Sequence, residues 1–112
     1  AESLERALTM AEARVRAGVL LGEVLMVREL VARMDYGQAR DRSSALFDSI
    51  RQEAMATPDP ALRDALNSAL GKRDAVTAGL AKGEAATAAI LHTVESDLRR
   101  ALGYDVPPAS AA

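Results

Sequence analysis

Apolar residues recur every three or four positions along most of this chain, which is the pattern of amphipathic α-helices. The first such stretch runs from residue 3 to residue 34. Its apolar positions are Leu4, Leu8, Ala11, Val15 and Val19, followed by the wider set Leu20, Leu21, Val24, Leu25, Val27, Leu30, Val31 and Met34. Because a wide apolar stripe contacts neighbours on more than one side, we predict a long helix over 3–34 with several packing partners.

A polar turn over residues 35–38 separates this stretch from the next. Asp35 and Gln38 have the spacing of a capping box, which predicts a second amphipathic helix over residues 36–56. Proline is excluded from helix interiors but fits the first turn of a helix. Pro58 therefore ends the second helix, and Pro60 begins the third.

A register that alternates steps of four and three continues from Leu62 to Ala101. It predicts one continuous third helix over residues 60–103 with coiled-coil packing. Lys82-Gly83 is typical of a helix C-terminus, so a break at Gly79–Gly83 is the alternative. We therefore expect an all-α fold, an antiparallel bundle of three helices with a long third helix, or of four helices if the chain breaks there. Residues 1–104 form one domain in this prediction, and residues 105–112 form a flexible tail.

The length of the third helix predicts a surface that the chain cannot cover by itself. A helix of ~44 residues is ~66 Å long and outruns the first helix. Its overhang carries a set of apolar residues that we predict to bind a client or a second copy: Ile90, Leu91, Val94, Leu98 and Leu102. The first turns of the first helix, with Leu4, Leu8 and Ala11, would be partly bare as well. If the chain instead folded back near Lys82-Gly83 and buried the predicted set, this argument would fail.

Composition excludes several classes of function. The chain has no Cys and one His, which rules out disulfides, thiolate metal sites and a His cluster for zinc. We expect no metal and no cofactor. The net charge of −2 gives no footprint for nucleic acid or an anionic membrane. No apolar run approaches the ~20 residues that span a bilayer, and no signal peptide is visible. The cytoplasmic location that we expect follows from the family resemblance described below.

Catalysis has little support in the sequence. Carboxylates such as Glu23 and Asp48 fall on faces of mixed charge, which is typical of solvated helix surfaces. Gly18 and Gly22 lie inside the first helix, where small residues permit close contact between helices. The methionines are interpreted as fillers of the core. We therefore predict that the protein is not an enzyme.

His92 is the one residue that invites chemistry. The segment Leu91–Leu98, followed by Leu102-Gly103-Tyr104, looks superficially like the phospho-accepting helix of histidine kinases. Thr93 stands where that helix has an acidic residue, and Asp97 stands where it has proline. A half-exposed structural histidine is the simpler interpretation.

The region from residue 28 to residue 50 carries a family resemblance. Residues 28–36, Arg-Glu-Leu-Val-Ala-Arg-Met-Asp-Tyr, are followed by Ser-Ser-Ala-Leu-Phe-Asp-Ser-Ile over 43–50. This arrangement resembles the bacterial flagellar export chaperones of the FliT and FlgN type. In that class a long first helix ends in an acidic-aromatic turn, a second helix has a Leu-x-x-x-Ile pattern, and a proline-marked turn leads into a long third helix. The resemblance covers most of the chain by architecture and about 25 residues by motif.

The resemblance implies a chaperone or adaptor that binds the helical terminus of a flagellar subunit before export. The implied client is a filament-cap or hook–filament junction protein, held in an apolar groove. A homodimer is a further possible partner arrangement. The alternative is a signalling module, either a helical sensor domain or a degenerate histidine phosphotransfer protein that uses His92. A purely structural oligomerisation bundle is the third hypothesis.

Overall fold

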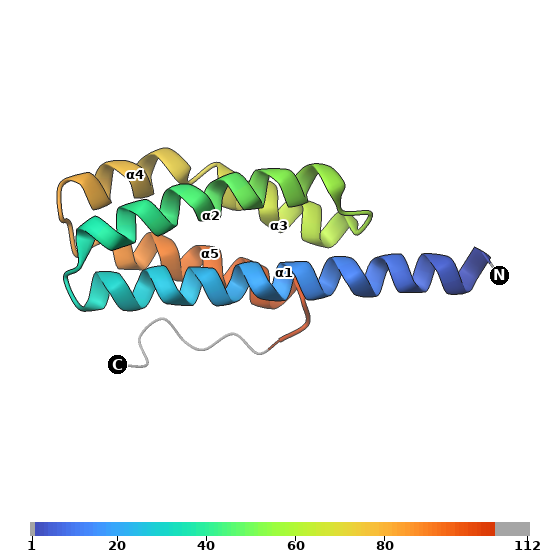
Figure 1. Ribbon diagram of the computed structural model, residues 1–112. Helices are drawn as coiled ribbons and strands as arrows, with labels where there is room; N and C mark the ends of the chain where they lie inside the picture. The colour runs from blue at the N-terminus through green and yellow to red at the C-terminus, as the bar shows by residue number, and fades with distance from the viewer. Residues whose placement is uncertain (1, 105–112) are drawn as a thin grey trace.

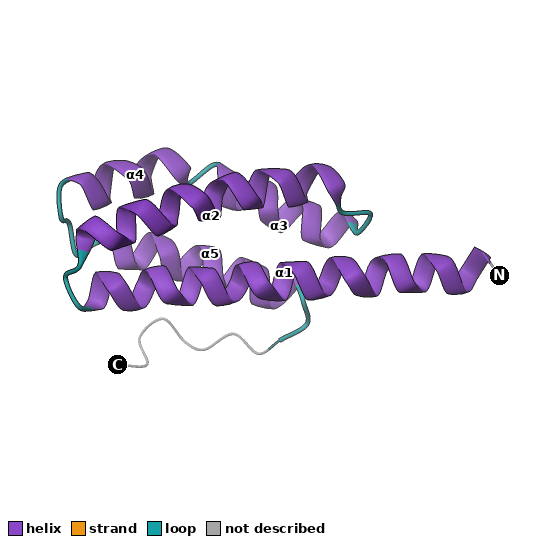
Figure 2. Cartoon of the chain, viewed as in Figure 1, coloured by secondary structure: helices purple, strands orange, loops and turns teal. Residues whose placement is uncertain are grey.

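The computed structural model describes residues 2–104, and the regular elements in this range are all α-helices (Figure 2). In chain order they are α1 (Glu2–Ala32), α2 (Tyr36–Ala56), α3 (Pro60–Leu70), α4 (Arg73–Ala81) and α5 (Thr87–Ala101). The predicted all-α bundle is confirmed. The predicted tail over 105–112 lies outside the described residues.

The helices form a bundle of four legs that alternate in direction (Figure 1). α1 and α2 make the first antiparallel pair, α3 and α4 follow one another as the third leg, and α5 returns beside α1. α1 contacts α2, and α2 contacts both α3 and α4. These last two helices contact α5, and α5 contacts α1, which closes the ring. The buried apolar side chains gather in one core inside this ring.

The prediction of a continuous third helix is wrong, because the chain is interrupted twice after Pro60. A short turn at Gly71-Lys72 separates α3 from α4, and a longer one separates α4 from α5. The second interruption lies close to the predicted alternative break. Gly83 there adopts φ 66°, and the next amide, of Glu84, donates to the Gly79 carbonyl at 2.9 Å. This left-handed cap favours a residue without a Cβ, and glycine fills that position at the end of α4.

α1 ends in the same kind of left-handed cap, but the residue in the left-handed conformation is a methionine. Met34 adopts φ 60°, and the Asp35 amide donates to the Leu30 carbonyl at 2.9 Å. This cap stops the helix at Ala32, two residues before the predicted end. The Asp35 side chain then accepts a hydrogen bond from the Gln38 amide at 3.3 Å and caps α2, as the sequence predicts.

The predicted apolar overhang of the third helix does not exist in this fold. The reversal after α4 turns α5 back into the bundle, where it packs on α1 and α3. The four leucine and valine members of the predicted set are at most 2% exposed: Leu91, Val94, Leu98 and Leu102. Ile90 is half-buried and packs against the same core. In the folded chain these residues serve the interior, so they are not available as a docking surface.

A buried carboxylate fastens α5 to α1. Glu95 accepts hydrogen bonds from Arg28 of α1 and, at 2.8 Å, from Arg99 one turn further along α5. Burial raises the pKa of Glu95, but the hydrogen bonds and charges of Arg99 and Arg28 outweigh this effect and hold that pKa below its ordinary value. Glu95 is therefore ionised in the folded protein at neutral pH.

The corner between α4 and α5 is packed tightly. A Cβ placed on Gly79 would lie 2.1 Å from Thr87 Oγ1, far inside contact distance. Thr87 is itself buried, and its hydroxyl has no hydrogen-bond partner among the described residues. Glycine at position 79 is therefore a requirement of the close approach between these two helices.

Candidate docking face

The N-terminal part of α1 runs beyond the rest of the bundle (Figure 1). Ala13 is the first buried residue of α1. Near this point Arg16 reaches the last turn of α2, with its Nε 2.7 Å from Glu53 Oε1. Residues 2–12 therefore form a helical extension of about 16 Å that the other helices do not cover.

α1 has apolar residues on two opposite sides. The inner face, which packs on the other helices, consists of the buried residues Ala13, Ala17, Leu20, Leu21, Val24, Val27, Leu30 and Val31. The outer face consists of small and apolar residues that are exposed or half-exposed: Leu4, Leu8, Ala11, Val15, Gly18, Val19, Gly22, Leu25 and Met26. Val15 lies two residues, or about 200° around the helix, from both Ala13 and Ala17. The two faces are therefore distinct, and the bundle covers the inner one.

The outer face exposes large side chains over an unbroken length. Leu4 is 72% exposed and Val15 is 69% exposed, and Leu8 and Val19 are each 62% exposed. Burying such a side chain completely is worth roughly 1.5–3 kcal/mol. Single exposed apolar residues, such as Met34 and Met55 elsewhere in this chain, are ordinary. A contiguous row is not ordinary, so the outer face is a candidate association surface.

Two glycines on the outer face have no internal explanation. A Cβ placed on Gly18 or on Gly22 would meet no atom within 4 Å. Glycine inside a helix costs about 1 kcal/mol relative to alanine. The packing of this chain therefore does not require glycine there, in contrast to Gly79. Close approach by another helix would require it.

Shallow grooves flank the outer face on both sides. On the side of α2, a groove of about 470 Å³ lies between Val19 and Leu20 of α1 and Gln52 and Glu53 of α2. On the opposite side, a groove of about 510 Å³ runs along Ala11, Val15 and Gly18 and is closed by Tyr104.

Glu53 gives the groove beside α2 a polar wall. Its Oε1 accepts from Arg16, and this hydrogen bond raises the pKa of Arg16. Its Oε2 is buried and has no partner among the described residues.

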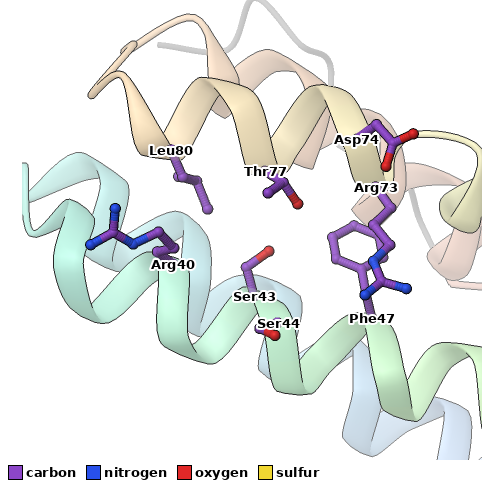
Figure 3. A pocket seen from close by; sticks show the side chains of 8 residues that line it. All are labelled: Arg40, Ser43, Ser44, Phe47, Arg73, Asp74, Thr77 and Leu80. Atoms are coloured by element: carbon purple, nitrogen blue, oxygen red, sulfur yellow. The ribbon is translucent and has the colours of Figure 1, made fainter.

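A third pocket, of about 400 Å³, lies between α2 and α4 (Figure 3). Phe47 and Leu80 form its apolar part, and the Ser43 and Thr77 side chains point toward it. No hydrogen bond joins a serine or threonine hydroxyl of this pocket to a histidine or carboxylate within residues 2–104. The pocket therefore contains no paired nucleophile and base.

His92 lies on α5 and is half-buried. Its Nε2 is 3.4 Å from the hydroxyl of Ser96, and it lines a small surface pocket together with Arg28 and Thr93. Arg28 is already paired with Glu95. The structure thus places His92 apart from the outer face of α1.

Metal binding and membrane spanning each require a recognisable arrangement of residues. Residues 2–104 hold no group of three His, Cys, Asp or Glu side chains arranged for a metal ion. None of the helices in this part of the chain has both the length and the apolar character needed to cross a membrane. No family model matches the chain, and neither a curated protein nor a solved structure matches it.

The sequence identifies the residues of the outer face but assigns most of them to the core. The bareness predicted for Leu4, Leu8 and Ala11 agrees with their exposure. Val15 and Val19 continue the same stripe. The sequence predicts that they pack inside the bundle, but in the structure they are exposed. The signal that separates the faces is the second apolar series, which begins at the alanines Ala13 and Ala17 and is easily overlooked because alanine is small.

Proposed function

We propose that this chain is a non-catalytic docking protein, a chaperone or adaptor that binds an amphipathic helix of a client along the outer face of α1. The observation that carries the proposal is the unbroken exposed row from Leu4 to Met26 on the side of α1 opposite its own bundle. An apolar helix face of this kind recognises another helix through anchors spaced three and four residues apart.

The grooves define what the client should look like. An apolar side chain of the client fits beside Val19 and Leu20, where most of the lining is apolar. A lysine or arginine next to that anchor would lie beside the Glu53 side chain, which lines the same groove. Small residues on the client helix would be required where Val15 approaches it, and larger ones opposite Gly18 and Gly22.

The class of client rests on the motif over residues 28–50. That resemblance proposes the cytoplasm as the location and the helical terminus of a flagellar cap or hook–filament junction subunit as the client. The binding residues in this proposal are those of the outer face, and they replace the predicted set on α5.

A direct test measures the affinity of labelled peptides. The peptides are the terminal helices of the cap and junction subunits encoded in the same genome, and the readout is fluorescence anisotropy. We expect V15D to weaken binding at least about tenfold, because a carboxylate must be desolvated at the centre of the contact. M55D is the matched control, since Met55 is 83% exposed, belongs to α2 and is not among the residues that line the groove between α1 and α2. Equal binding by wild type and V15D would refute the proposed site.

A further inference from the structure

In the absence of a client, the outer face leaves its row of large apolar residues in water. We infer that the free protein covers this face with a second copy of itself, through an antiparallel pairing of the two α1 helices. This inference rests on the proposed function, because it concerns the resting state of the same face. A client helix would replace the second copy.

The length of the surface selects the occupant. The outer face extends from Leu4 to Met26, about 33 Å along the helix. The C-terminal segment of this chain, Asp-Val-Pro-Pro-Ala-Ser-Ala-Ala over 105–112, contains a single large apolar residue, Val106. It lacks the side chains to cover the row. A second α1, at 31 residues, has both the length and the apolar face.

The distribution of large and small residues favours one register. When Leu8 of one copy lies opposite Leu25 of the other, Ala11 lies opposite Gly22 and Val15 lies opposite Gly18. The central layers of this antiparallel pair then combine a small residue with glycine, or a valine with glycine. The open space at both glycines becomes the space that the second helix fills.

Charge agrees with the antiparallel direction. The first turn of α1 carries Glu2 and Glu5, and an antiparallel arrangement sets this acidic turn beside the C-terminal end of the second α1, which is followed by Arg33 in its pair with Glu29. The dipoles of the two helices then point in opposite directions side by side, which is favourable.

The arrangement also explains the extension of α1. Residues 2–12 of one copy lie on the outer face of the second copy's α1. They cover the stretch whose inner face packs on the second copy's own bundle. Each bundle stays on the far side of its own α1, because the inner and outer faces are opposite. The two bundles therefore do not collide, and the contact closes on itself as a twofold dimer.

Light scattering coupled to size exclusion gives the first test, on the complete chain. Wild type and M55D should have the mass of a dimer, and V15D and G18L should have the mass of a monomer. G18L is informative because a Cβ at Gly18 meets no atom of its own chain within 4 Å, so we expect the fold to be retained while the dimer layer opposite Val15 is blocked. Circular dichroism and thermal unfolding confirm that both variants are folded. A wild-type monomer, or a G18L dimer, overturns the inference.

Disulfide trapping gives the direction, and it is clean because the chain has no cysteine of its own. L8C and L25C are prepared separately, mixed and oxidised. The antiparallel register predicts that the mixture forms the mixed disulfide much faster than either variant links to itself. Rapid self-linking of L8C indicates a parallel pair and overturns the register.

The two proposals fail separately. If the wild type is a dimer that client peptides do not dissociate, the dimer stands and the chaperone proposal fails. If the wild type is a monomer that binds the peptides, the chaperone proposal stands and the dimer fails.

Discussion

Glycine and leucine occur both at the corner between α4 and α5 and on the outer face of α1. Their surroundings are opposite, because they are closely packed at the corner and exposed on the outer face. At the corner, Gly79 is required because Thr87 fills the space next to it, and the leucines of α5 are sealed inside. On the outer face, Gly22 has empty space beside it and Leu8 is 62% exposed. The corner shows what this fold needs for itself. The outer face has exposed apolar residues and glycines that the packing of this chain does not require, and the proposed partner is argued from them.

The largest expected difference between the two regions comes from removing a leucine side chain in each. L98A should reduce the free energy of unfolding by about 2–5 kcal/mol, because it leaves a cavity in the core. L8A should change the free energy of unfolding by less than about 0.5 kcal/mol in dilute protein. Chemical denaturation of both variants measures this. Equal losses would mean that Leu8 is covered within one chain.

The hydrogen bonds of Glu95, which join α5 to α1, should have the next largest effect on the free energy of unfolding. E95Q should cost about 1–3 kcal/mol at pH 7, because two charge-assisted hydrogen bonds are weakened. The pKa of Glu95 is lowered by folding, so its contribution is complete above the ordinary glutamate pKa of about 4.3 and is lost as pH falls through the lowered value. The difference between wild type and E95Q should therefore shrink in acid.

Unfolding titrations at pH 7, pH 5 and lower measure this difference. E29Q is the control, because Glu29 makes an exposed pair with Arg33 one turn away. E29Q should have little effect at any pH. A gap between wild type and E95Q that stays constant into acid would contradict the account of Glu95.

A methyl group at position 79 tests the tight corner. G79A should lower the free energy of unfolding by about 1–3 kcal/mol, because Thr87 must move and α4 and α5 must separate slightly. The variant G79A/T87A also removes the Thr87 hydroxyl, whose oxygen lies nearest to the added Cβ, together with the methyl group of Thr87. It should recover part of the loss in thermal unfolding if the clash with that side chain is the cause.

Replacing glycine by alanine on the outer face should raise the free energy of unfolding rather than lower it. G22A should stabilise a single chain by about 0.5–1 kcal/mol, because alanine favours the helix and its Cβ meets nothing. The measurement belongs in a V15D background, where association does not contribute. A destabilising G22A would show that the glycine has a role within the chain.

The sequence predicts the first two helices well because their boundaries are marked by local chemistry. The capping side chain of Asp35 and the prolines around Asp59 act within a few residues, and the structure contains both caps. The third leg is different. Its apolar spacing passes through both interruptions without a slip, so periodicity alone cannot show where the chain turns back.

The candidate site depends on that turn. Once α5 is folded back, the leucines of the predicted set become core, and the exposed row must be found elsewhere. Which of two apolar faces on α1 is covered depends on where the other helices lie, and that is tertiary information. The local hint was a glycine pair with no turn, ligand motif or helix end to explain it.

The extension of α1 has a consequence for its own order. Residues 2–12 make one helix with the core segment, yet an isolated helix of this length is marginal in water. Their helicity is propagated from the bundle and should fray from the tip, with amide exchange fastest at the first turns. A partner seated there would suppress this fraying, so exchange protection at the tip would report occupancy of α1 without any label on the partner.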